Sequence, residues 1–87
     1  MGDRQLPTGN GSGITLAEHA RQCLEHYFAQ LGEQEPKNLY ELVLAEVEKP
    51  LLETVLKQAG ENQTKAAKIL GLSRSTLRKK LEHYRIE

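Results

Sequence analysis

Three glycines, Gly32, Gly60 and Gly71, each follow a stretch in which apolar residues recur at helical spacing. Glycine readily adopts the left-handed backbone conformation that commonly ends a helix. A further stretch with the same spacing follows Gly71, and no stretch alternates apolar and polar residues as a half-buried strand does. The pattern therefore predicts an all-α chain with helices at residues 16–31, 39–59, 63–70 and 74–84.

Residues that commonly cap helix N-termini stand before each predicted helix. Thr15 is followed three positions later by Glu18, the spacing of a capping box, in which each side chain accepts a hydrogen bond from the other residue's backbone N–H. Asn38 begins a second stretch with this spacing, and Asn62 and Ser73 precede the two short helices. These residues place the four helix starts independently of the apolar pattern.

Pro50 lies inside the second predicted helix. A proline in a helix interior removes one backbone hydrogen bond and costs about 3 kcal/mol. Because the apolar pattern continues on both sides of Pro50, we expect one helix with a kink rather than two helices.

Composition divides the chain into three parts. Residues 1–14 hold four of the seven glycines and have no helical or strand period, which predicts a flexible arm. Residues 15–60 contain the two longer helices and are assigned to dimerisation. Residues 61–87 carry seven Lys and Arg against three Glu, whereas residues 1–60 carry five against nine Asp and Glu. A basic end on an acidic body indicates a polyanionic partner at that end alone.

Several functional classes find no support in the sequence. Cys23 is the single cysteine, so an internal disulfide and a multi-cysteine zinc site are excluded, and we expect it to be a small core residue in a reducing cytoplasm. His19, His26 and His83 form no cluster, and no nucleophile is paired with a base. No apolar run reaches the roughly 20 residues of a membrane span. We therefore expect no enzyme activity, metal, cofactor, small-molecule substrate or membrane association.

The two short helices have the pattern of a helix-turn-helix. Ala66 and Ala67 are small enough for a close helix crossing, Gly71 suits the tight turn four residues after Ala67, and Leu72 and Leu77 can fill the space around it. With Leu77, Leu81 and Tyr84 turned inward, the exposed side of the last helix shows Arg74, Ser75, Arg78, Lys79 and Glu82, with Thr76 at the margin. Arginine can read a guanine edge in the major groove, and lysine suits phosphates. The unit is thus predicted to bind duplex DNA.

The second helix is apolar over a wide arc, because Leu51–Leu52 and Val55–Leu56 are adjacent pairs that point about 100° apart. One helix of the same chain is too narrow to cover that arc, whereas a second copy of the chain would cover it. We therefore predict a homodimer; a monomer covered by its own helices is the alternative. The predicted interface residues are Leu24, Tyr27, Phe28, Leu42, Val43, Val47 and Leu51.

Residues 38–48, 50–52, 62–67 and 76–81, together with 27–31, resemble the Fis family, the small nucleoid-associated DNA-bending proteins of bacteria. The resemblance covers about residues 15–85. It implies a four-helix subunit, an intertwined homodimer, two recognition helices set too close together for straight DNA, and a nucleoid-associated transcriptional regulator in the cytoplasm. With the helix-capping argument, it gives eleven predicted DNA-binding residues: Asn62, Gln63, Thr64, Lys65, Ser73, Arg74, Ser75, Thr76, Arg78, Lys79 and Lys80.

Two departures from the family pattern carry their own expectations. Family members often have Asn at the position of Ser73 and a Lys pair at Glu82-His83, so we expect weaker affinity or altered flank contacts here. The arm lacks the alternating Val and Thr of the family's β-hairpin, so we expect DNA bending without stimulation of a DNA invertase. RNA polymerase and a recombinase are candidate partners. Two alternative identities remain: the DNA-binding module of an NtrC-like activator, and a helical protein–protein adaptor.

Overall fold

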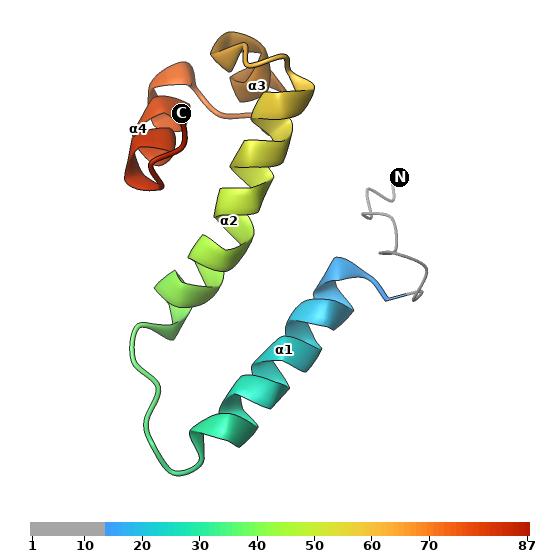
Figure 1. Cartoon of the computed structure of the whole chain (residues 1–87), viewed down its shortest axis with the longest axis vertical. Helices are drawn as coiled ribbons and strands as arrows, with labels where there is room; N and C mark the ends of the chain where they lie inside the picture. Colours follow the sequence, from blue (N-terminus) through green and yellow to red (C-terminus); the bar gives the residue numbers. More distant parts are fainter. Residues whose placement is uncertain (1–13) are drawn as a thin grey trace. The chain divides into compact units, whose positions relative to one another are not determined.

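The computed structural model describes residues 14–87. These residues form four α-helices and no strand: α1 (Leu16–Leu31), α2 (Leu39–Gln58), α3 (Gln63–Leu70) and α4 (Arg74–His83) (Figure 1). The prediction of an all-α chain with four helices is confirmed. Of the predicted arm only Ile14 is described, so the expectations for residues 1–13, including the one on DNA inversion, lie outside the described residues.

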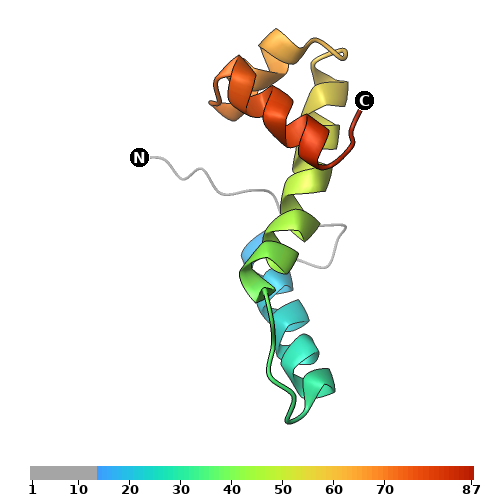
Figure 2. The same ribbon diagram turned by 90° about the vertical axis from the view of Figure 1, so that its left-hand side faces the viewer.

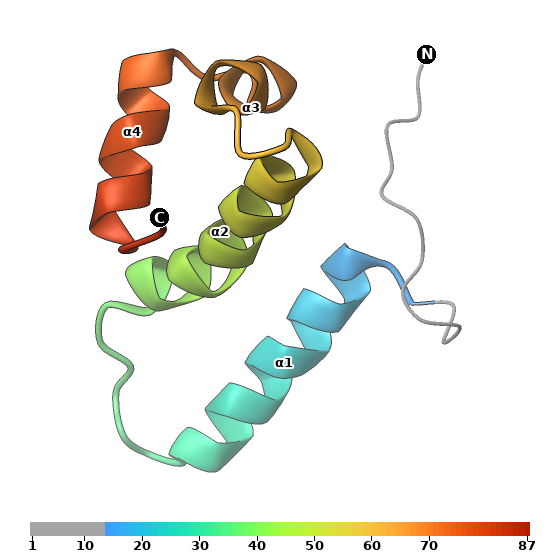
Figure 3. The same ribbon diagram turned by 45° about the horizontal axis from the view of Figure 1, so that its top comes forward.

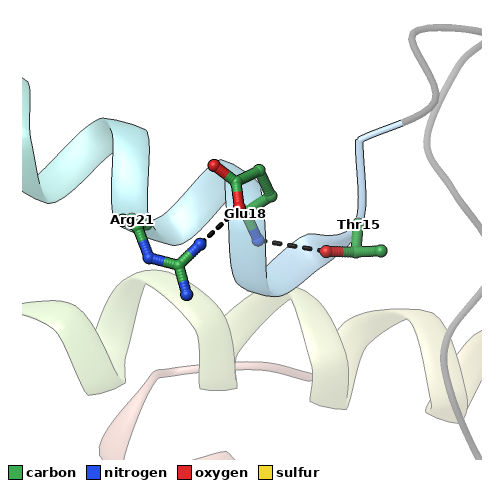
Figure 4. Close-up of polar contacts among 3 residues, drawn as sticks. All are labelled: Thr15, Glu18 and Arg21. Atoms are coloured by element: carbon green, nitrogen blue, oxygen red, sulfur yellow. Dashed lines mark hydrogen bonds and ion pairs between the residues drawn. The ribbon is translucent and has the colours of Figure 1, made fainter.

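The start of α1 agrees with half of the predicted capping box. The Thr15 hydroxyl accepts a hydrogen bond of 3.1 Å from the Glu18 backbone N–H (Figure 4). The Glu18 carboxylate forms an ion pair with Arg21 instead of turning back to the Thr15 amide. α1 ends at Leu31 and is capped by Gly32, whose φ is 66° and whose N–H donates to the Phe28 carbonyl. Both predicted ends of this helix are therefore correct.

The predicted burial of Cys23 is wrong for the single chain, in which its side chain is exposed. α1 contains no buried residue at all. The apolar spacing of the sequence identified a helix correctly, but periodicity alone does not say what covers the apolar face.

At the start of α2 the role predicted for Asn38 is also wrong. Its backbone is left-handed, with φ 53° and ψ 35°, and its side chain makes no capping hydrogen bond. A capping side chain needs an extended backbone at its own residue, whereas Asn is one of the few residues that tolerate the left-handed region. α2 then runs through Pro50 without a break, as predicted. The kink at Pro50 stays a prediction.

The chain divides into two compact units after Lys37, the second comprising α2, α3 and α4. In this second unit α3 lies at the C-terminal end of α2, and α4 returns beside α2 (Figures 2 and 3). Its core takes residues from all three helices: Leu52, Leu56, Ala59, Ala66, Ala67, Leu77 and Leu81. The C-terminal half of α2 is thus the platform on which the two short helices pack.

Candidate nucleic-acid interface

The contact between α3 and its neighbours depends on two small residues. Ala66 and Ala67 are 1% and 4% exposed and belong to the same core as Leu77 of α4. A larger side chain at either position would occupy space that the neighbouring helices already fill. The structure therefore confirms the small-residue crossing that the sequence predicted.

The turn between α3 and α4 is made by Gly71 and Leu72. Gly71 has φ 77° and ψ 26°, in the left-handed region, and the Leu72 N–H donates to the Ala67 carbonyl at 2.9 Å. Apart from Gly71 itself and its two chain neighbours, no heavy atom of the described residues lies within 4 Å of the position that a Cβ at Gly71 would take. Glycine is therefore favoured here by its backbone conformation and not by lack of space.

Gly71→Ala is expected to lower the free energy of unfolding by about 1–2 kcal/mol, because an ordinary L-residue pays that cost in the left-handed region. Gly71→Asn is the control, since asparagine tolerates this conformation and should lose clearly less. Urea unfolding followed by circular dichroism measures both. Equal losses for the two variants would contradict the conformational explanation.

Side-chain caps stabilise the N-terminal ends of the two short helices. The Asn62 Oδ1 atom accepts from the Lys65 N–H at 3.1 Å, and the Ser73 Oγ atom accepts from the Thr76 N–H at 3.2 Å. Both caps were predicted from the sequence. The Ser73 hydroxyl also lies 2.9 Å from the Thr76 Oγ1 atom and 3.3 Å from the Ser75 Oγ atom, so three short-range hydrogen bonds hold the start of α4.

The outward side of α4 carries Arg74, Ser75, Arg78 and Lys79, all exposed, and we call these four residues the recognition face. Thr76 is half-buried at its margin, as predicted. Within residues 14–87, the cationic groups of Arg74, Arg78 and Lys79 take part in no ion pair or side-chain hydrogen bond. Three positive charges on one helix are therefore available to an external anionic partner.

The N-terminal end of α3 supplies a second cationic element. Thr64 and Lys65 are exposed and Gln63 is half-buried. Free backbone N–H groups and the helix dipole favour an anion at such an end. Glu82 and His83, where the family pattern often has a Lys pair, are both exposed, so their expected effect on DNA flanks stays a prediction.

Lys80, which the sequence analysis grouped with the DNA-binding residues, has a partner inside the chain. Its Nζ atom lies 2.8 Å from the Glu48 Oε2 atom of α2. The other oxygen of Glu48 accepts a hydrogen bond of 2.5 Å from the Tyr84 hydroxyl. Glu48 is not among the residues predicted from the sequence, because no local pattern connects it with Tyr84, 36 positions away.

These contacts shift two acid–base equilibria. The hydrogen bond from Lys80, followed by that from Tyr84, holds the pKa of Glu48 below its ordinary value. The same carboxylate raises the pKa of Tyr84, because ionising the hydroxyl would remove the hydrogen bond and place two negative charges together. The charged carboxylate and the neutral phenol are thus the forms that the fold favours.

Acid is expected to weaken the fold through Glu48. Its pKa is lower when folded than unfolded, so its contribution to stability is complete above its ordinary pKa of about 4.3 and is lost as pH falls through the lower, folded value. Glu48→Gln should therefore be less stable than the wild type at neutral pH and lose less stability on acidification. Urea unfolding at a series of pH values measures this. Parallel curves for wild type and variant would contradict the assignment.

The recognition face, the turn at Gly71 and the two capped helices together have the architecture of a helix-turn-helix. Residues 43–84 match the family model described as "Bacterial regulatory protein, Fis family". Proteins named "DNA-binding protein Fis" from Proteus mirabilis (strain HI4320), Escherichia coli O1:K1 / APEC and Yersinia pestis (strain Pestoides F) are each 54% identical to this chain over 69 residues, which cover 79% of the chain and 70% of the relative. The chain belongs to the Fis family. The resemblance identified from the sequence is confirmed.

Membership of the Fis family bears on two of the predicted identities, a Fis protein and the DNA-binding module of an NtrC-like activator. The match to proteins named DNA-binding protein Fis extends over 69 residues, well beyond the helix-turn-helix of α3 and α4 that alone suggested an NtrC-like activator. This extent favours a Fis protein over an activator module. The Fis family consists of bacterial regulatory proteins, so the chain is a regulator and not an enzyme.

The described part of the chain adds two negative findings. Among residues 14–87 no three His, Cys, Asp or Glu side chains are grouped so that they could hold a metal ion. In the same residues, no helix combines the length and the apolar character needed to cross a membrane.

Proposed function

We propose that this Fis-family chain is a homodimer that binds and bends double-stranded DNA and acts as a nucleoid-associated transcriptional regulator. The observation that carries the proposal is the recognition face, whose three cationic side chains have no partner within the described residues. The names of the relatives support DNA as the polyanion.

The DNA-binding residues fall into two proposed roles. Arg74 and Arg78 project from the N-terminal half of α4, the part of a recognition helix that meets base edges in the major groove. The remaining proposed contacts position the protein on the backbone through side-chain donors and through the N-terminal amides of α3 and α4. They are Asn62, Gln63, Thr64, Lys65, Ser73, Ser75, Thr76 and Lys79; Lys80 belongs to the arrangement discussed in the next subsection.

Exposed apolar side chains support the proposed dimer. Phe28 of α1 and Leu42, Val47 and Leu51 of α2 are 46%, 48%, 40% and 47% exposed in the single chain. The other three predicted interface residues, Leu24, Tyr27 and Val43, are half-buried. Apolar side chains that point to water mark, on each of these helices, a face that a second copy can cover.

Two recognition helices per dimer make bending the natural consequence of binding. If the helices lie closer together than one turn of DNA, only bent DNA reaches both. Smooth bending by 40–90° costs of order 1–6 kcal/mol, which added phosphate contacts offset. A gel-shift assay with circularly permuted fragments tests binding and bending together. Position-independent mobility of the complexes would contradict bending but not binding.

Binding is expected to depend strongly on salt. If each dimer neutralises roughly 6–8 phosphates, a plot of log K against log salt concentration should have a slope of about −5 to −7. Fluorescence anisotropy with a labelled duplex measures this slope. A flat plot would contradict DNA binding and favour a helical adaptor that uses the recognition face on another partner.

A location on the nucleoid follows from the proposed DNA binding. RNA polymerase and a recombinase are proposed as protein partners, in keeping with a regulator that bends DNA near other DNA-bound machinery. Copurification on a DNA fragment that carries a bound dimer, with and without Arg74→Ala, separates partners that need the DNA complex from those that bind the protein alone.

A further inference from the structure

Glu48 uses both of its carboxylate oxygens to hold one end of α4. The Oε1 atom accepts from the Tyr84 hydroxyl at 2.5 Å, and the Oε2 atom lies 2.8 Å from the Lys80 ammonium. The Glu48 side chain is 18% exposed and that of Lys80 is 34% exposed, so water screens the arrangement only in part. We call these three residues the α2–α4 clamp.

The α2–α4 clamp constrains the orientation of α4, which the apolar packing alone does not. Leu77 and Leu81 fix α4 to the core, but apolar contacts are non-directional and tolerate rotation of a helix about its axis. Hydrogen bonds weaken steeply when their angles change. Lys80 and Tyr84 are four positions apart and hence on the same side of α4, so two attachments to one carboxylate set both the rotation and the tilt of the helix.

The charged residues around the clamp determine which lysine of α4 can offer its charge to DNA. A cleft of about 340 Å³ between α2 and α4 is lined by Glu41 and Glu48 on one side and by Lys79, Lys80 and His83 on the other. Lys79 is exposed and has no ion-pair partner within residues 14–87, whereas the Lys80 charge is already compensated by Glu48. Two adjacent lysines therefore differ in the charge that they can offer to a phosphate.

We propose that Glu48 is a positioning residue for DNA recognition: it orients α4 through Lys80 and Tyr84 and withholds the Lys80 charge from DNA. The inference rests on the proposed DNA binding and deepens it. Glu48 follows Val47 directly on α2, and Val47 is one of the residues assigned to the dimer interface. The clamp thus ties each recognition helix to the helix that carries the interface, so that the spacing of the two recognition faces is preserved when DNA is bent.

The decisive test measures salt dependence and sequence preference of the full-length dimer for Glu48→Gln. Released from its partner, Lys80 should neutralise one further phosphate in each protomer, which steepens the slope of log K against log salt by about 2 per dimer. Preference for a specific site over random duplex should fall by about tenfold as α4 loses its fixed orientation. An unchanged slope and preference overturn the proposal.

A second variant identifies the charge responsible. When Glu48→Gln is combined with Lys80→Gln, the slope of log K against log salt should return to the wild-type value, while the preference for a specific site stays low. Lys80→Gln alone should lower preference without flattening the slope. If Lys80→Gln flattens the slope as much as Lys79→Gln does, Lys80 is an ordinary phosphate contact and the proposal is wrong.

Two further variants separate the positioning of α4 from the general effect of removing a negative charge from α2. Glu46→Gln makes the same change of charge at an exposed position of α2 with no ion pair among the described residues, and should change neither quantity. Tyr84→Phe keeps the ion pair but removes one hydrogen bond, so preference should fall with the slope unchanged. This variant carries the test if Glu48→Gln fails to fold, and unchanged preference in Tyr84→Phe then overturns the positioning role. If log K of the wild-type protein does not depend on log salt concentration, the proposed DNA binding itself is contradicted. Failure of the proposed function and failure of the role proposed for Glu48 therefore give different results.

Discussion

Arg74→Ala is expected to abolish most of the preference for a specific site while leaving binding to random duplex largely in place. Arg74 is the first residue of α4, exposed and without an internal partner in the described chain. A bidentate contact with a guanine edge is worth about 1–3 kcal/mol of discrimination, which corresponds to roughly 5- to 150-fold for each protomer. Competition titrations with specific and random duplexes measure both affinities.

Two matched variants make this prediction sharper. Arg74→Lys keeps the charge but loses the planar fork of the guanidinium, so preference should still fall. Lys79→Ala removes a neighbouring exposed cation and should weaken specific and random binding alike. If Arg74→Ala and Lys79→Ala have the same profile, the division into base-reading and phosphate-binding roles is wrong.

Val47→Glu is expected to dissociate the dimer and, with it, to abolish high-affinity DNA binding. Val47 is 40% exposed in the single chain and is assigned to the interface between two copies. A two-fold interface would bury the new carboxylate twice, without a partner of opposite charge. Sedimentation velocity measures the oligomeric state, and gel shift measures the loss of complex.

The control for this prediction is Ile69→Glu on α3. Ile69 is another β-branched residue, 55% exposed, and outside the predicted interface. Its replacement should leave the oligomeric state unchanged, although the added negative charge lowers DNA affinity. A dimeric Val47→Glu variant would show that the second copy covers a different surface.

Features that depend on neighbours in sequence were predicted well. The bounds of α1 and α3 are those expected, and Thr15, Asn62 and Ser73 cap their helices as expected. α4 ends at His83, one residue earlier than predicted, and α2 ends at Gln58, one residue before the predicted end. Capping and termination involve atoms within about four residues, so the local sequence contains most of the information.

Features that depend on distant residues were predicted poorly. Cys23 was expected in a core, but which face of a helix is covered depends on elements elsewhere in the fold or on another chain. Asn38 has the residue type of a cap and lacks the backbone for it, because the incoming loop determines that backbone. Lys80 is among the predicted DNA-binding residues, because nothing in the local sequence shows its ion pair with Glu48.

The sequence by itself determined the helices, the Ala and Gly residues of the tight turn, the basic C-terminal end and the membership of the Fis family. The helices and the turn follow from residue types at short, regular spacings, each of which has a local physical cause, whereas the family follows from the likeness to known Fis proteins. Only the tertiary structure decided which cations are free. Arg74, Arg78 and Lys79 have no partner in the described chain, whereas Lys80 is bound by Glu48. Coulombic and hydrogen-bonding energies depend on distances through space, and folding brings a carboxylate of α2 to α4 across a separation in sequence that no local pattern records.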